Sequence, residues 1–161
     1  MNIFILHEDL HESAKLLADQ HLGKQILEIA QILSTVSDGP YRPTHKNHPV
    51  TIWAEKHKET VHQYAHVLDN EYQYRFNKRH KSSLVIEELR MKGNMFYTMV
   101  DTDDLKSFPI RNNIDYYMEK LTAWLNRDKP LRARWTSRPV PKWYEDLTGN
   151  TQANTPNFVF M

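Results

Sequence analysis

The sequence predicts an all-α fold: a compact single domain over residues 1–161, with three principal helices, long loops and an extended basic C-terminal segment. Two observations predict it. Apolar residues recur every three or four positions over three long segments, which is the period of an amphipathic helix. A strand-like pattern is confined to the first six residues, MNIFIL, and one short strand makes no sheet. The chain also has the usual size of one domain with its own core.

The three principal helices are expected near 12–36, 51–79 and 113–126. The sequence SDGP ends the first, and Pro49 suits the first turn of the second because its missing N–H would be unpaired there. The three helices are expected to pack around Leu22, Ile26, Ile29, Val61, Leu68, Leu121 and Trp124.

Three further segments lie between or after these helices. A short helix is expected after Ser82 or Ser83, through LVIEELRM. The stretch 100–112 is typical of a loop, and the tail, rich in Pro and Arg, is expected to be extended.

Composition excludes several classes of protein. The chain has no Cys, which excludes a disulfide framework, zinc–thiolate sites and thiol catalysis, and fits a reducing compartment. No apolar run approaches the ~18 residues that span a bilayer. The start of the chain lacks the basic region of a signal peptide. We therefore expect a soluble cytoplasmic protein with no membrane partner.

Positive charge is concentrated near the C-terminus. Residues 127–144 carry a net charge of +5, so the rest of the chain carries −4 of the total of +1. A second basic run, RFNKRHK, covers 75–81. Basic residues interleaved with aromatic ones suit nucleic acid, with phosphates bound by Arg132, Arg134, Arg138 and Lys142. Trp143 or Tyr144 would then stack on an unpaired base. The alternative is a solvated tail whose aromatic residues dock on the body of the protein.

One side of the first helix carries reactive side chains. His21, Lys24, Gln25 and Glu28 lie three or four residues apart, beside the apolar stripe, and Gly23 adjoins them. A glycine here costs a helix about 1 kcal/mol relative to alanine, which suggests that something approaches closely. The alternative is the ordinary polar side of an amphipathic helix, with Lys24 and Glu28 as a surface ion pair.

The loop before the second helix is a further candidate site. Its polar residues crowd a helix N-terminus, which favours an anion such as a phosphate; they are Arg42, His45, Lys46, Asn47 and His48. The alternative is a structural corner in which Asn47 and His48 cap the helix. We expect one pocket to hold His21, Glu28, His45, Asn47 and His48.

Nine histidines raise the possibility of a metal site. Glu59, His62 and His66 have suitable helical spacing, but the pattern turns them towards solvent, and no other helix repeats the motif. His45 and His48 lie in a loop with no carboxylate beside them. We expect no bound metal and no cofactor.

Three segments resemble one family. The segment LADQHLGKQILEIAQILSTV (17–36) resembles a helix of the phage pyrimidine-dimer DNA glycosylases of the endonuclease V type, and RPVPKWYEDLTG (138–149) resembles their tail. The combination of LGKQ…E…QIL with KNHPVTIW is similar to uncharacterised phage and bacterial relatives of those enzymes. If the chain is phage-encoded, the host cytoplasm is its expected location.

The resemblance implies an enzyme that kinks duplex DNA, extrudes a damaged or modified pyrimidine nucleotide and breaks its N-glycosidic bond. Glu28 would be the catalytic carboxylate, His21 would hydrogen-bond the nucleotide, and Gly23 would let the sugar–phosphate backbone pass close by.

In this family the nucleophile is the amine of a threonine that removal of the initiator methionine exposes. Here residue 2 is Asn2, so Met1 is expected to remain and to carry the amine, with Lys24 or Lys46 as substitutes. Leu27 and Gln31 stand where the family has phosphate-binding arginines. Two alternatives remain: a phage-type base-modifying transferase on the same fold, and a non-catalytic DNA-binding module.

Overall fold

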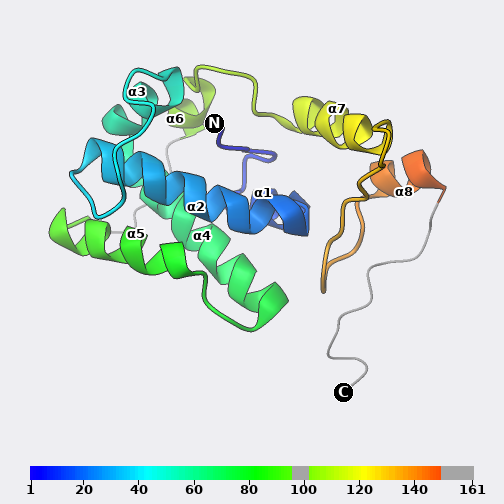
Figure 1. The fold of residues 1–161 in the computed structure, drawn as a ribbon, viewed down its shortest axis with the longest axis horizontal. Helices are drawn as coiled ribbons and strands as arrows, with labels where there is room; N and C mark the ends of the chain where they lie inside the picture. The colour runs from blue at the N-terminus through cyan, green and yellow to red at the C-terminus, as the bar shows by residue number, and fades with distance from the viewer. Residues whose placement is uncertain (96–101, 150–161) are drawn as a thin grey trace.

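The structure, a computed structural model, describes residues 1–95 and 102–149. Within these ranges the chain forms eight helices and no strand, which confirms the all-α prediction (Figure 1). Their bounds are α1 Leu10–Leu16, α2 Asp19–Val36, α3 Pro49–Lys56, α4 Lys58–Phe76, α5 Lys81–Lys92, α6 Thr102–Lys106, α7 Ile114–Leu125 and α8 Lys142–Thr148. Helix α2 packs against α3, α4 and α5. None of the helices in the described ranges combines the length and the apolar character needed to cross a membrane.

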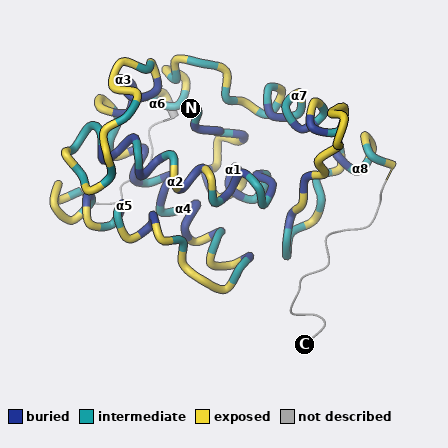
Figure 2. Tube along the Cα trace, viewed as in Figure 1, coloured by how far each residue is buried: buried dark blue, intermediate teal, exposed yellow. Residues whose placement is uncertain are grey.

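The core forms around α2 and α4, where dark blue segments meet in Figure 2. Every residue that the sequence assigned to the core is buried there: Leu22, Ile26, Ile29, Val61, Leu68, Leu121 and Trp124. The apolar period therefore predicted the core correctly.

The first expected helix, 12–36, is two helices. Leu17 and Ala18 are extended and separate α1 from α2. The cause is the buried Arg75, whose guanidinium donates hydrogen bonds to the carbonyls of Ala14, Lys15 and Leu17. Carbonyls at the end of a helix lack the backbone N–H donors that a continuing helix would give them. The Arg75 guanidinium supplies donors in their place. Arg75 thus caps α1, and its ion pair with Asp19 at 3.0 Å holds the start of α2.

The second expected helix, 51–79, is also divided. It breaks at His57, whose Nδ1 lies 3.2 Å from a carboxylate oxygen of Asp104 in α6. Pro49 lies in the first turn of α3, as predicted. Helix α4 ends at Phe76, where Asn77 adopts the left-handed conformation with φ of 52°.

Three further expectations were tested. The short helix after Ser82 or Ser83 is confirmed as α5, which begins at Lys81. Within 100–112, residues 100 and 101 lie outside the described residues, but 102–106 form α6 instead of a loop. The tail is extended only up to Pro141, because α8 follows and docks the buried Tyr144 against Trp135.

The first six residues form no strand. They run extended through the interior, and Ile3, Phe4 and Leu6 are buried. Side chains of the surrounding segments satisfy this backbone: Gln25 accepts from the Phe4 N–H at 2.9 Å, and Tyr64 donates to the Phe4 carbonyl at 2.6 Å. Buried backbone groups need such partners in the absence of a neighbouring strand. The segment places Met1 beside α2.

Candidate active site

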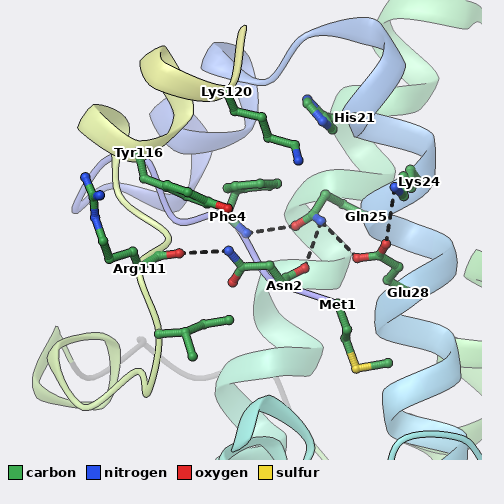
Figure 3. A pocket seen from close by; sticks show the side chains of 11 residues that line it. Met1, Asn2, Phe4, His21, Lys24, Gln25, Glu28, Arg111, Tyr116 and Lys120 are labelled. Carbon is green, nitrogen blue, oxygen red and sulfur yellow. Dashed lines mark hydrogen bonds and ion pairs between the residues drawn. The ribbon is translucent and has the colours of Figure 1, made fainter. Parts of the chain in front are cut away.

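A pocket of about 300 Å³ opens beside α2, between the N-terminal segment and the chain around α7 (Figure 3). Its lining includes four of the residues that the sequence proposed for catalysis, namely Met1, His21, Lys24 and Glu28, but not the substitute amine Lys46. The other lining residues are Asn2, Phe4, Gln25, Ile110, Arg111, Tyr116 and Lys120.

Gln25 fixes the N-terminal segment against α2. Its amide accepts a hydrogen bond from the Phe4 N–H and donates one to the Asn2 carbonyl at 3.0 Å. The same Nε2 lies 3.5 Å from a carboxylate oxygen of Glu28. Gln25 is 1% exposed, so its side chain has little room to move. One amide therefore sets the position of Met1 relative to Glu28.

Among the described residues that line the pocket, Glu28 is the only carboxylate. Its side chain is 17% exposed, and the amine of Lys24 lies 3.8 Å away. Lys24 itself is largely exposed. The pair is the one that a surface helix would form, but the pocket places it beside Met1 and Gln25 (Figure 3). A carboxylate so placed can stabilise positive charge that develops in the pocket.

His21 is buried at the other end of the pocket. Its ring stacks on Trp124, with 4.6 Å between centroids, and tilts against Phe4 at 5.4 Å. Burial, helped by the charges of Lys120 and Lys24, lowers the pKa of His21 to about 3. The imidazole is therefore neutral at physiological pH and serves as a hydrogen-bonding group without charge.

Lys120 and Tyr116 come from α7, on the opposite wall. The Lys120 side chain extends into the space between Phe4 and His21 (Figure 3). Lys120 was not predicted as a site residue, because the apolar period of this helix indicates only its core side. One signal was available: Lys120 follows the buried Tyr117 by three residues, and so adjoins the apolar face.

Arg111 contributes chiefly through its backbone. Its carbonyl accepts a hydrogen bond from the Asn2 side chain at 2.8 Å. Its guanidinium is bound to the Glu119 carboxylate at 3.2 and 3.3 Å and points away from the pocket (Figure 3).

The loop before α3 lies beside a second hollow, of about 770 Å³, on the neighbouring side of α2. Arg42 and His45 line this hollow, together with Leu27 and Gln31. Asn47 and His48 line neither pocket, so the expectation of a single pocket was wrong. The reason is that neighbouring residues of α2 point to different sides of the helix. Leu27 and Gln31 line the second hollow, whereas Glu28 lines the first pocket.

His48 nevertheless lies close to the N-terminus. Its Nδ1 accepts a hydrogen bond from the Val50 N–H and caps α3, as the structural alternative proposed. Burial, followed by the charge of the N-terminal amine, lowers the pKa of His48. Lys46 and Asn47 are exposed beside it. The loop therefore borders the site without entering it.

Gly23 does not face the pocket. A Cβ added at Gly23 would meet Tyr72 at 3.4 Å and His80 at 3.6 Å. The close approach that the glycine allows is thus that of α4 and the start of α5. The expected passage of a sugar–phosphate backbone at this residue was wrong.

The basic residues of the tail lie in two kinds of surroundings. Arg132, Arg134 and Lys142 are exposed, and the backbone of Arg132 and Arg134 is hydrogen-bonded to Gln20, which precedes His21. Arg138 instead binds the Glu71 carboxylate at 2.8 and 2.9 Å and lies 3.8 Å from the Tyr74 ring centroid. Arg138 is therefore not a free cation for phosphate.

The tail aromatics pack on the body of the protein. Tyr144 is buried, and its hydroxyl accepts a hydrogen bond from the Ala133 N–H at 2.9 Å. Trp143 is half-buried, edge-on to Trp135 and Tyr144, with its indole N–H buried. The stacking role was wrong for Tyr144, and the placement of Trp143 favours the docking alternative.

The basic run 75–81 is not a solvated polycation. Arg75 is buried between Asp19 and Glu71, and Arg79 pairs with Asp69 and Glu87. Asp19 lies 56 residues before Arg75, whereas the other three acidic partners lie within ten residues of their arginines but outside the run itself, so a count of charges over 75–81 did not reveal them.

The histidine stripe of α4 also differs from expectation. His62 is 1% exposed, because α1, α2 and α5 all pack against α4. Its predicted orientation towards solvent was wrong. No group of three His, Cys, Asp or Glu residues in the described ranges is arranged to hold a metal ion.

Comparison with known proteins identifies the family. A family model described as pyrimidine dimer DNA glycosylase matches residues 1–84, which is just over half of the chain. The chain belongs to this family. Among curated proteins and solved structures, none matches the chain.

This pyrimidine dimer DNA glycosylase family relationship supports a DNA glycosylase-type function with DNA as the substrate. The matched residues include one wall of the pocket, from Met1 to Glu28. The wall formed by Lys120 and Tyr116 lies outside the match.

Proposed function

We propose that this protein is a DNA glycosylase that extrudes a damaged or modified pyrimidine nucleotide from duplex DNA and attacks its N-glycosidic bond, with Glu28 as the catalytic carboxylate. One observation carries the proposal: the pocket gathers Glu28, Met1, His21 and Lys24 on the family-matched half of the chain. DNA is the partner, and no metal or cofactor takes part.

Glu28 has the chemistry that bond cleavage needs. Breaking the bond leaves positive charge on the sugar, and a carboxylate beside C1′ stabilises that oxocarbenium-like transition state. Glu28 is half-buried, so water screens its charge less than it would at an exposed position.

An amine supplies the nucleophile. The α-amine of Met1 attacks C1′, the electron pair of the broken C1′–N bond leaves with the base, and the amine loses a proton, which the departing base takes up. Met1 is the first candidate because Gln25 holds its segment in the pocket. Its side chain extends towards α3, where Sδ lies 3.7 Å from the Thr51 hydroxyl. Lys24, which lines the pocket, is the second candidate amine, whereas Lys46 is exposed on the loop outside the pocket and is not favoured as the nucleophile.

The bound duplex lies across the loop and the tail. Leu27 and Gln31 line the second hollow and carry no charge, so the phosphate contacts fall to Arg42, His45 and Lys46 on the loop and to Arg132, Arg134 and Lys142 on the tail. These exposed residues flank α2, while Lys24 and Lys120 bring positive charge to the pocket itself.

The test uses duplex oligonucleotides that carry one thymine dimer or one modified pyrimidine, with an undamaged duplex as reference. Glu28→Gln should reduce base release by about a hundredfold or more while DNA affinity is retained. Glu119→Gln, an exposed carboxylate bound to Arg111, is the matched control and should release base at the wild-type rate.

Mass spectrometry of the products separates the alternatives. Loss of the base supports the glycosylase. A gain of mass on the nucleotide would instead show a transferase, and tight binding without any product would show a binding module. Full activity of Glu28→Gln would remove Glu28 from the mechanism.

A further inference from the structure

His21 is hydrogen-bonded to a tyrosine from the other half of the chain. Its Nδ1 lies 2.7 Å from the Tyr117 hydroxyl, and the same hydroxyl accepts a hydrogen bond from the Ala18 N–H at 2.9 Å. Tyr117 belongs to α7, outside the segment that the family model matches. Both side chains are almost completely buried, so water is not an alternative partner for either contact.

The number of protons in this group fixes the direction of the bond. Burial raises the pKa of Tyr117, so its hydroxyl keeps its proton. The Ala18 N–H already donates to the oxygen. If His21 also donated from Nδ1, the hydroxyl proton of a buried tyrosine would have no acceptor among the described residues, at a substantial cost. The hydroxyl proton therefore goes to His21, and Nδ1 is the acceptor.

A neutral imidazole carries one N–H, so an accepting Nδ1 places the proton on Nε2. The ring cannot readily turn over, because Trp124 stacks on it and Phe4 packs against it. The charged groups that approach His21 are Lys24 of α2 and Lys120 of α7, and both disfavour a second proton. His21 lines the pocket, which leaves Nε2 as the nitrogen that can meet a ligand.

We propose that Tyr117 is a positioning residue that holds His21 as the neutral Nε2–H tautomer, so that His21 donates a hydrogen bond to a carbonyl oxygen of the target pyrimidine. The identity of the acceptor rests on the proposed function, whereas the tautomer does not. A nitrogen that already carries a proton takes up no other. His21 is thus a recognition donor and does not act as a general base.

The first experiment is nuclear magnetic resonance of the full chain labelled with ¹⁵N histidine, using long-range ¹H–¹⁵N spectra between pH 5 and 8. The His21 signals are assigned by their loss in His21→Asn. We expect a protonated Nε2 and a bare Nδ1 that do not change over this range. A protonated Nδ1, or a titration of His21 within the range, would overturn the proposal.

The second experiment compares Tyr117→Phe with Tyr144→Phe, which also deletes a buried hydroxyl that accepts a backbone N–H, but one that is not hydrogen-bonded to His21. Tyr117→Phe should change the His21 signals and lower kcat for base release about tenfold. Tyr144→Phe should lower thermal stability and leave both unchanged. Equal behaviour of the two variants would make Tyr117 merely structural and refute its positioning role.

The wild-type spectra decide the tautomer even if Tyr117→Phe does not fold. If the spectra show the Nε2–H tautomer but no duplex loses a base, the proposed function fails while the tautomer assignment stands.

Discussion

Gln25 uses both ends of its side-chain amide to hold the N-terminal segment against α2. Its sequence pattern is that of any polar residue on a helix, yet it is buried and bound to two backbone groups that have no strand neighbour. The role of Gln25 therefore depends on its hydrogen-bond partners more than on the exposure of its side chain. Gln25 is thus one of the side chains that hold the segment carrying Met1, together with Tyr64 and Asn112.

We predict that Gln25→Ala lowers both stability and activity. It leaves the Phe4 N–H and the Asn2 carbonyl without this partner, which should cost about 1–3 kcal/mol of unfolding free energy in urea denaturation. Base release should fall further, because Met1 is no longer held. Gln31→Ala, on the same helix but lining the other hollow, is the control. If Gln25→Ala were destabilised but kept wild-type activity, catalysis would not depend on the hydrogen bonds between Gln25 and the N-terminal segment.

At the level of helices, the sequence predicted where apolar faces lie but not where helices break. The period placed Leu22 and Leu68 in the core correctly. It could not show the break before α2, because Arg75 lies 58 residues beyond the Leu17 carbonyl that it caps. The same limit applies to the site. His21, Lys24 and Glu28 share one helix, so their spacing predicts that they lie together. Tyr117 meets His21 only through the tertiary fold.

Helix α4 shows a second limit of periodicity. A pattern with one apolar face assumes one buried side, but α4 is covered by α1, α2 and α5. His62 is consequently buried, and neither of its ring nitrogens has a hydrogen-bond partner among the described residues. Burial, together with the charges of Arg90 and Lys58, lowers the pKa of His62 to about 4.

This burial predicts a loss of stability in acid. The unfolded chain binds a proton at His62 near pH 6.5, whereas the folded chain does so only near pH 4. The unfolding free energy should therefore fall as the pH drops through this window, with His62 contributing about 1.4 kcal/mol per pH unit. Urea denaturation at pH 6.5 and 5 should show a smaller loss for His62→Phe than for the wild type. The exposed His11→Gln should match the wild type, and equal losses in all three would contradict the prediction.

Over the whole molecule, the tertiary fold decides which charged side chains form ion pairs and which stay exposed. Arg75 and Arg138 share the Glu71 carboxylate, which joins α4 to the tail. Arg132 and Arg134 remain exposed beside the N-terminal end of α2. Arginines that are neighbours in the sequence therefore have different roles, one structural and two available to a polyanion.

This division predicts two distinct outcomes for DNA binding. Replacing Arg132 and Arg134 together by Gln should reduce the slope of log affinity against log salt by about two units, since each phosphate contact releases about one counterion. Arg138→Gln should leave the slope nearly unchanged and lower the unfolding free energy by about 2 kcal/mol, because Glu71 loses a charged partner. The assignment of phosphate contacts to Arg132 and Arg134 would be contradicted if Arg138→Gln reduced the slope. It would also be contradicted if the double variant left the slope unchanged.

The threaded N-terminal segment has a consequence for the order in which the molecule is completed during synthesis. Asn2 donates to the Arg111 carbonyl, and Asn112 donates to the Ile3 carbonyl, across a separation of 109 residues in each case. Contacts so far apart in sequence form slowly, because a long loop must close first. Asn2 and Ile3 can be locked in place only after Arg111 and Asn112 have been made. The pocket beside α2 therefore stays unfinished during synthesis until α7, which supplies Tyr116 and Lys120, has been made.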